Sequence, residues 1–237
     1  EIKVFRHGDM GHLREKLEEC KDAMAAGSHV LVITDGVFSM DGDIGKLDEM
    51  CRIAKQYGAI TMVDDAHASG VLGKSGRGTV DHFGIHGQVD IQVGTLSKAI
   101  GVVGGYVAGS RTLIDYLIMR ARPILFSTSA PPAVTAACME AFRLLEEEPW
   151  HIEKLWENTR FFKRELGLLG FNIGGVNTPA SETPITMTRK ARMNRPRVGS
   201  VAKACTELST PERTRKVPSS DSEKARIASS TVQFLKL

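Results

Sequence analysis

Apolar residues in the first part of the chain form two alternating patterns, short continuous runs and longer stretches with helical spacing. A short apolar run that ends in a polar residue is typical of a buried strand. The run at 29–35 is apolar on both faces, which predicts a strand in the centre of a parallel sheet. The strands expected from all such runs cover residues 2–5, 29–35, 59–64, 89–95, 105–108 and 124–126.

The stretches between these runs repeat their apolar residues every three or four positions, as amphipathic helices do. Asp9 can cap the first of them, and Gly58 can end the second. The expected helices cover residues 9–26, 46–57, 111–120, 132–147 and 151–169. Strands that alternate with helices in this way predict an α/β fold, a mostly parallel sheet with helices on both faces.

The character of the sequence changes after Pro184. Segment 185–237 carries 12 Lys and Arg against 4 Asp and Glu, a net charge of +8, whereas the rest of the chain has a net charge of −5. Thirteen of these 53 residues are Ser or Thr, and apolar residues follow no clear period until the last few positions. This composition predicts a disordered tail or the product of a shifted reading frame.

Composition also excludes several classes of protein. The net charge of +3 is too small to indicate a nucleic-acid partner, and no specific nucleic-acid or membrane contact is expected. The four cysteines lie far apart and form no CxxC pair, which predicts no metal site and no disulfide framework. A reducing, cytoplasmic location follows from this cysteine usage.

Polar residues whose side chains can bind ligands or take part in catalysis follow the expected strands. Ser39, Asp64, His67, Thr95 and Lys98 lie at or just past strand ends, where parallel α/β sheets bind their ligands. A lysine in a desolvated position loses its proton more easily and becomes a nucleophile. The hydroxyl of Thr95 can contact an anion.

The segment 64–67, Asp-Asp-Ala-His, allows two interpretations. In one, Asp64 holds the proton of a heterocycle nitrogen and His67 donates to an oxygen on the same ring. In the other, the acids belong to an ATPase, but the nearest phosphate-loop candidate has Ala68 where glycine is required. The Asp-Gly-Asp at 41–43 lacks the twelfth-position Glu of a calcium loop, because that residue is Arg52.

Four motifs together resemble the α-oxoamine synthases, pyridoxal-phosphate (PLP) enzymes of the aspartate-aminotransferase fold, also called fold type I. In this sequence they read Thr-Asp-Gly-Val-Phe-Ser-Met-Asp-Gly at 34–42, Val-Asp-Asp-Ala-His at 63–67, Gly-Arg-Gly at 76–78 and Gly-Thr-Leu-Ser-Lys-Ala at 94–99. The resemblance runs from about residue 2 to Pro184. It implies an incomplete PLP-binding large domain at 1–149, a linking helix and the start of a small domain at 150–184, and an unrelated tail at 185–237.

The resemblance also implies roles for individual residues. Lys98 corresponds to the lysine that forms the Schiff base, Asp64 to the partner of the pyridinium nitrogen, and His67 to the donor to the ring hydroxyl oxygen. The remaining cofactor contacts that the resemblance implies are Thr95 to the phosphate, Ser39 to the cofactor, and Thr128 and Ser129 to the phosphate of the neighbouring subunit's PLP.

Within the family the sequence looks most like the glycine C-acetyltransferase branch. That branch joins glycine to acetyl-CoA to give 2-amino-3-oxobutyrate and CoA. The alternative is the 8-amino-7-oxononanoate synthase branch, which condenses an acyl-CoA or acyl carrier protein with alanine and releases CO₂. A non-catalytic remnant is a third possibility.

The resemblance further implies a homodimer with active sites shared between subunits. In the family, a portion before the position of Glu1 supplies a histidine that stacks on the cofactor ring. We therefore expect this chain to hold only part of the active site.

Overall fold

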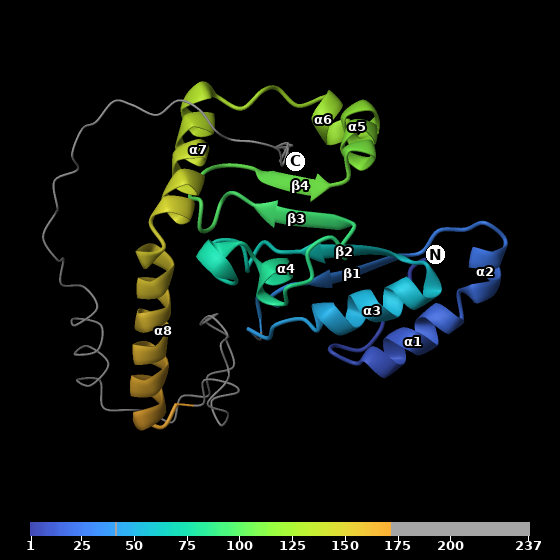
Figure 1. Cartoon of the computed structure of the whole chain (residues 1–237), viewed down its shortest axis with the longest axis horizontal. Coiled ribbons are helices and arrows are strands. Elements are labelled where there is room, and N and C mark those ends of the chain that lie inside the picture. Colours follow the sequence, from blue (N-terminus) through green and yellow to red (C-terminus); the bar gives the residue numbers. More distant parts are fainter. Residues whose placement is uncertain (41, 172–237) are drawn as a thin grey trace, which may run out of the picture.

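A four-stranded sheet forms the centre of the computed structural model, which describes residues 1–40 and 42–171 (Figure 1). The strands are β1 (Leu31–Asp35), β2 (Ile60–Asp64), β3 (Ile91–Thr95) and β4 (Gly105–Gly109), in the order β1-β2-β3-β4. β1, β2 and β3 are parallel, and β4 is antiparallel to β3. The mostly parallel α/β sheet predicted from the sequence is confirmed, whereas the predicted tail at 185–237 lies outside the described residues.

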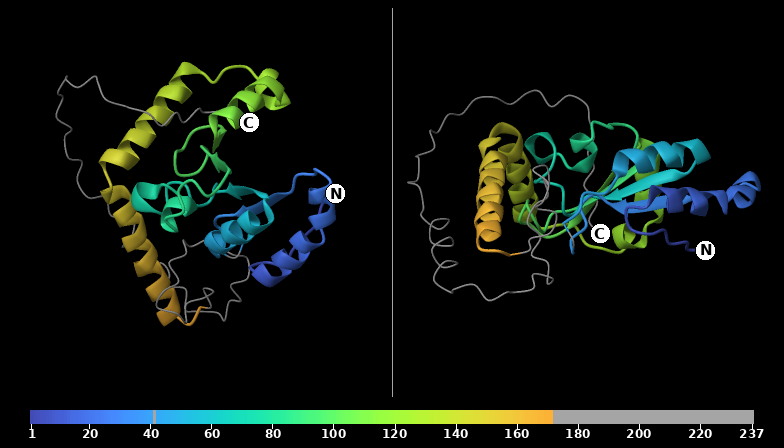
Figure 2. Two further views of the ribbon diagram at one scale, coloured as in Figure 1. Left: turned by 45° about the vertical axis from the view of Figure 1, so that its right-hand side comes forward. Right: turned by 90° about the horizontal axis from the view of Figure 1, so that it is seen from below.

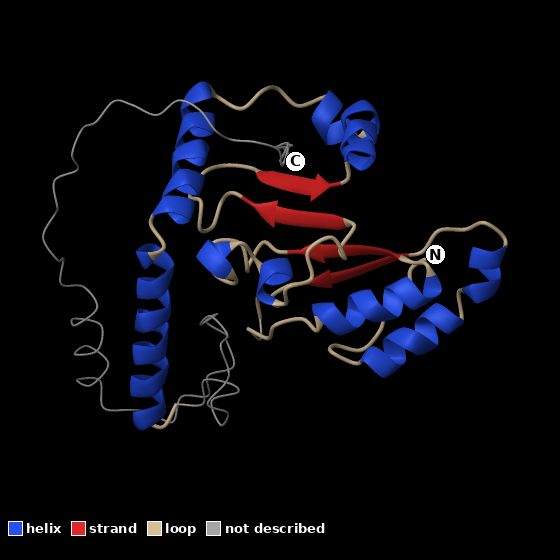
Figure 3. Cartoon of the chain, in the orientation of Figure 1, coloured by secondary structure: helices blue, strands red, loops and turns tan. Residues whose placement is uncertain are grey.

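The connections explain the strand directions. α3 (Leu47–Tyr57) crosses from β1 to β2, and the short helices η1 (Lys74–Gly76) and α4 (Thr79–His82) lie between β2 and β3. Such crossovers let three strands run the same way. The connection from β3 to β4 contains no helix, so the chain reverses there, and the arrowhead of β4 points opposite to the other three in Figure 3.

One face of the sheet is covered by α1 (Met10–Glu18) and α3. Leu13 and Leu17 of α1 and Ile53 of α3 are at most 2 % exposed and pack with Val32 and Val63 of the strands. Burying a side chain of this size contributes about 1.5–3 kcal/mol. This cluster is the main core of the described chain.

Local sequence sets the ends of these helices as expected. Asp9 caps α1, since its side chain accepts a hydrogen bond of 2.9 Å from the His12 N–H. Gly58 ends α3 in the left-handed conformation, with φ +68°.

The other face is covered over β3 and β4 by α5 (Arg111–Arg120) and α6 (Arg122–Leu125). Val107 and Ile114 are buried there, against Ile91, Val93 and Ile124. Figure 2 shows α5 and α6 on the side of the sheet opposite to α1 and α3. Helices therefore lie on both faces, as predicted.

Two longer helices follow at the side of the sheet where β3 ends. α7 (Pro132–Glu147) places Cys138 against Leu96 and Ile100, which belong to the loop after β3. α8 (Trp150–Leu168) contributes Trp156, whose indole N–H donates a 3.0 Å hydrogen bond to the Val71 carbonyl. Both helices match the sequence prediction to within one residue.

Three sequence predictions are wrong. Residues 2–5 form no strand, because they pair with no neighbour, and Ile2 and Val4 are exposed. The helix expected at 9–26 is two helices, α1 and α2 (Lys21–Ala25), since the Cys20 N–H bonds the Leu17 carbonyl and closes α1 with a tight turn. Segment 124–126 is not a strand: most of it belongs to α6, which begins at Arg122 and has Pro123 in its first turn.

The strand expected at the centre of the sheet lies at its edge. β1 pairs only with β2 among the described strands, and Leu31 and Ile33 are 45 % and 52 % exposed. Both side chains lie on the same face as α5 and α6, but these two helices cover β3 and β4 and do not reach β1. The apolar sequence of β1 is thus buried on one face alone in the described part of the chain.

Cys51, on α3, is expected to resist alkylation in the folded chain. It is 3 % exposed, and burial, with smaller contributions from the charges of Asp90 and Asp48, raises its pKa to about 11. Because the thiolate is the reactive form, iodoacetamide at pH 8 should modify the half-buried Cys20 before Cys51. Peptide mass spectrometry over a time course measures the order, with chain unfolded in urea as the control. Equal rates in the folded chain would contradict the packing of α3.

Candidate active site

Two carboxylates meet at the carboxyl ends of β1 and β2. Asp35 and Asp64 are paired in the strand register, so their side chains lie side by side on the same face of the sheet. One oxygen of Asp64 accepts a 2.9 Å hydrogen bond from the Ala66 N–H, which fixes the direction of the carboxylate. Both side chains are half-buried.

His67 belongs to a turn that follows Asp64. The Asp65 carbonyl accepts hydrogen bonds from the N–H groups of Ala68 and Ser69, at 3.0 and 2.9 Å, and so closes one helical turn over residues 65–69. The Ser69 hydroxyl lies 2.7 Å from that of Tyr106 on β4. The turn is therefore connected to β4, at the other edge of the sheet, as well as to β2.

Lys98 lies in the loop between β3 and β4. The Leu96 N–H bonds the Gly104 carbonyl at 2.8 Å, the Val102 N–H bonds the Leu96 carbonyl at 2.9 Å, and the Gly101 N–H bonds the Lys98 carbonyl at 3.1 Å. These bonds give the loop a defined shape. The lysine side chain itself is exposed, so the desolvation expected from sequence is not provided by the described residues.

Gly70 brings the His67 turn against the Lys98 loop. A Cβ atom at Gly70 would lie 2.3 Å from the Cβ of Ala99, the residue after Lys98. Gly70 also has φ +79°, a conformation that glycine adopts without strain. The two loops thus meet at a point where no side chain fits.

The charges of these groups influence one another. Burial raises the pKa of Asp35, Asp64 raises it further, and His67 and Lys98 oppose the shift. Burial lowers the pKa of His67, Lys98 lowers it further, and Asp35 and Asp64 oppose. These effects favour the neutral imidazole of His67, with one ring nitrogen as donor and the other as acceptor. The structure brings Asp64, His67 and Lys98 near one another and adds Asp35 to the group.

Two further predicted residues carry hydroxyls near these loops. The Thr95 hydroxyl lies 2.9 Å from that of Ser97 and accepts a 3.3 Å hydrogen bond from the Ser97 N–H. This local turn starts the Lys98 loop. Ser39 lies in a separate hairpin after β1, which the bridge between Val37 and Ile44 closes.

Thr128 and Ser129 lie apart from the carboxylates. Both are exposed and line a cavity of about 400 Å³, together with Leu96, Gly104 and Gly105. This cavity borders the side of the β3–β4 loop that faces α7. Within one chain, the structure does not gather Thr128 and Ser129 with Asp64 and His67.

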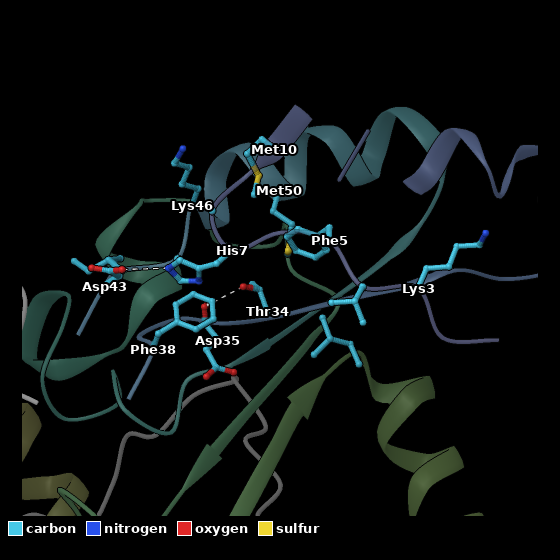
Figure 4. A pocket seen from close by; sticks show the side chains of 15 residues that line it. Lys3, Phe5, His7, Met10, Thr34, Asp35, Phe38, Asp43, Lys46 and Met50 are labelled. Atoms are coloured by element: carbon cyan, nitrogen blue, oxygen red, sulfur yellow. Dashed lines mark hydrogen bonds and ion pairs between the residues drawn. The ribbon is translucent and has the colours of Figure 1, made fainter. Parts of the chain in front are cut away.

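A second cavity, of about 720 Å³, opens beside Asp35 (Figure 4). His7 and Phe38 line it, with their rings edge to face at 4.4 Å, and His7 lies 3.1 Å from Asp43. Asp64, His67 and Lys98 are not among its lining residues. Asp35 is thus shared between this cavity and the group at the strand ends.

Sequence reasoning assigned no role to Asp35, Asp65 or Gly70. Asp35 could have been found, because it ends an apolar run as Asp64 does. Asp65 and Gly70 act through contacts with residues distant in sequence, for which the sequence carries no local signal.

Gly70→Ala is expected to destabilise the chain by about 3 kcal/mol, since left-handed strain of about 1–2 kcal/mol adds to a forced displacement of Ala99. Gly84→Ala is the matched control, with φ +64° and nothing within 4 Å of the added Cβ, and should cost only about 1–2 kcal/mol. Urea unfolding measures both. Equal losses in the two variants would contradict the close contact of the two loops.

Comparison with known proteins identifies the family of this chain. A family model described as aminotransferase class I and II matches residues 1–204. The chain belongs to the aminotransferase class I and II family. The match extends beyond Pro184, where the resemblance recognised in the sequence ends.

Individual members of the aminotransferase class I and II family agree closely with this chain. It is 58 % identical over 190 residues to 8-amino-7-oxononanoate synthase 1 of Bacillus velezensis, which covers 80 % of this chain and 48 % of that protein. It is 56 % identical over 186 residues to 8-amino-7-oxononanoate synthase of Thermoanaerobacter pseudethanolicus, with 78 % and 45 % covered. The chain therefore spans about half the length of the curated relatives it matches.

A solved structure supports the fold. The serine palmitoyltransferase of S. paucimobilis with a bound PLP–myriocin aldimine has a TM-score of 0.68 and 37 % sequence identity to this chain. The similarity covers 73 % of this chain and 44 % of that one. The type I fold expected from the motifs is thereby confirmed.

Residues 1–40 and 42–171 offer neither a cluster of metal ligands nor a helix suited to span a membrane. No group of three or more His, Cys, Asp or Glu side chains in this part of the chain could hold a metal ion. None of its helices combines the length and the apolar character needed to cross a membrane.

Proposed function

We propose that this chain is the cofactor-binding part of a PLP-dependent α-oxoamine synthase with the activity of an 8-amino-7-oxononanoate synthase. The observation that carries the proposal is the contact of Gly70 with Ala99, which places the Asp64–His67 turn against the Lys98 loop. The relatives named 8-amino-7-oxononanoate synthase, more than half identical to the chain, support the choice of activity.

The residues at the strand ends fit PLP chemically. A half-buried carboxylate suits a protonated pyridine nitrogen, a neutral imidazole suits the ring hydroxyl oxygen, and an exposed amine can reach the aldehyde carbon. Asp64, His67 and Lys98 supply these three groups on adjoining loops. The hydroxyl of Thr95 is proposed to contact the phosphate, and Ser39 to contribute a further cofactor contact.

Bound PLP supplies an electron sink that weakens the bonds at the amino acid's α-carbon. Asp64, held by the Ala66 N–H, keeps the proton on the pyridine nitrogen, so the sink stays strong. His67 donates its N–H to the ring oxygen and orients the ring. With PLP bound, the amine of Lys98 would move the proton at the α-carbon, since its loop adjoins the turn that carries His67.

Two subunits are proposed to build each site. Thr128 and Ser129 are exposed and lie apart from Asp64 within the chain. Their hydroxyls are proposed to reach the phosphate bound by a neighbouring copy, which requires a homodimer. The scattered cysteines of the sequence support a cytoplasmic location.

The substrates follow from the proposed product. Alanine that loses its carboxyl group leaves two carbons in a nine-carbon amino-oxo acid, so the acyl thioester must carry a seven-carbon dicarboxylic chain. A new carbon–carbon bond forms at the thioester carbonyl, the thiol of CoA or carrier protein leaves, and CO₂ is released. The second candidate is glycine with acetyl-CoA, the substrate pair of the glycine C-acetyltransferase branch that the sequence resembles.

A substrate test separates the candidates. The longest natural polypeptide that contains this sequence is loaded with PLP and given either alanine with heptanedioyl-CoA or glycine with acetyl-CoA. Release of both CO₂ and free thiol from the first pair is the expected result. Thiol release from the second pair alone would establish the second candidate instead. Release from neither pair would show that the chain belongs to another kind of PLP enzyme or to a non-catalytic remnant.

A further inference from the structure

Asp65 is a buried carboxylate that the proposed chemistry does not use. Its side chain belongs to a residue 3 % exposed, directly after Asp64. One oxygen accepts a 2.8 Å hydrogen bond from the Thr79 N–H, and the other accepts a bond from the Thr79 hydroxyl. Thr79, the first residue of α4, is itself fully buried.

Two glycines make room for this carboxylate. A Cβ at Gly36 would lie 2.1 Å from one Asp65 oxygen and 2.1 Å from the Thr79 hydroxyl. A Cβ at Gly78 would lie 2.1 Å from the other oxygen, and Gly78 has φ +93°. Gly36 follows β1, Asp65 follows β2, and Gly78 precedes α4, so the carboxylate joins three segments that the sheet brings together.

Joining these segments through a buried carboxylate carries a free-energy cost. Burying one costs several kcal/mol, and a well-packed apolar pair in its place is often equally stable or more so. Burial raises the pKa of Asp65 in spite of the two donors of Thr79. Stability alone therefore gives a weak reason for the charge, whereas two directional hydrogen bonds fix an orientation that apolar packing leaves adjustable.

By fixing its own orientation, Asp65 also fixes the turn that carries the site residues. Its main-chain N–H bonds the Val93 carbonyl at 2.7 Å, and its carbonyl closes the turn over 65–69. Asp64 precedes this residue and takes its own hydrogen bond from Ala66, inside the same turn. A rotation of Asp65 would move Asp64 and His67 together.

We propose that Asp65 is a positioning residue whose bonds to Thr79 hold the turn that presents Asp64 and His67 to the pyridine ring. The proposal rests on the proposed function for the identity of the ring, and on the structure alone for the contacts.

The test uses four variants of the full chain. Asp65→Asn removes the charge and one acceptor, and Thr79→Val removes only the hydroxyl donor. Thr79→Ser keeps both donors. Asp81→Asn is the matched control, because Asp81 lies on the same helix and its hydrogen bonds go to the Lys74 N–H, at 2.6 Å, and to His86, at 3.0 Å, rather than to the turn. Each variant is examined by PLP binding, measured from the visible absorption band, and by the ring ¹H–¹³C resonances of the histidines recorded without PLP.

Asp65→Asn is expected to weaken PLP binding at least tenfold and to shift the His67 resonance, while those of His12 and His151 stay in place. Thr79→Val should change both in the same direction by less, and Thr79→Ser and Asp81→Asn should match the parent chain. Wild-type PLP affinity and an unmoved His67 resonance in Asp65→Asn would overturn the proposal. If Asp65→Asn does not fold, Thr79→Val decides by the same two readings.

The two proposals fail differently. A parent chain that binds no PLP would count against the proposed function, whereas the His67 resonance would still report whether Asp65 holds the turn.

Discussion

Replacing Lys98 with Ala is expected to lower turnover by roughly 10⁴-fold or more, a loss of about 5.5 kcal/mol at the transition state. Lys98 is proposed both to hold the cofactor covalently and to move the proton at the α-carbon. The described structure places its loop against the turn that carries His67. Its charge also contributes to the shifted pKa values of His67 and Asp35. A side chain without an amine removes both functions at once, so the losses are not separable.

Lys74→Ala is the control for this prediction. Lys74 is exposed at the start of η1, and its main-chain N–H, which bonds Asp81, is kept in the variant. Turnover of the PLP-loaded protein is measured for both variants with the substrate pair that the parent uses. A Lys98→Ala variant with more than a few per cent of parental turnover would remove Lys98 from the mechanism.

Replacing Asp64 with Asn is expected to lower turnover by roughly 10²–10³-fold, about 3–4 kcal/mol, on the scale of other preorganised electrostatic groups. The amide keeps the size of the side chain and its bond from the Ala66 N–H. It cannot hold a proton on the pyridine nitrogen by charge, so the electron sink weakens. Because the shape is retained, PLP should still bind, and the loss should fall mainly on kcat.

Asp48→Asn is the control for Asp64→Asn, since Asp48 is an exposed acid in the first turn of α3. Steady-state kinetics give kcat and KM for each variant, and the visible absorption band gives the amount of PLP bound. Near-normal kcat in Asp64→Asn with PLP fully bound would exclude the role assigned to this carboxylate.

The sequence predicted the location of the candidate site because one local rule applies at each strand. An apolar run ends in a polar residue, and parallel strands bring such residues to one edge of the sheet. Asp64 and Thr95 follow this rule at β2 and β3, and His67 and Lys98 lie within three residues of them. The long helices α7 and α8 were predictable for a similar reason, since their periodicity extends over several turns.

Features set by distant contacts could not be predicted. The edge position of β1 depends on which strands pair with it, and its apolar sequence reads equally well as a central strand. The short helix α4 has too few residues to show a period, and its first residue is held by Asp65. The exposure of Lys98 likewise depends on what covers its loop, which residues near it in sequence do not determine.

Lys98 is proposed to be the lysine that binds PLP, and borohydride reduction identifies that lysine chemically. The chain is incubated with PLP, reduced with borohydride and digested, and the peptide that carries the stable pyridoxyl group is sequenced by mass spectrometry. We expect the label on Lys98, with Lys98→Ala unlabelled and Lys74→Ala labelled like the parent chain. A label on Lys74 or on any other lysine, or none at all, would contradict this expectation.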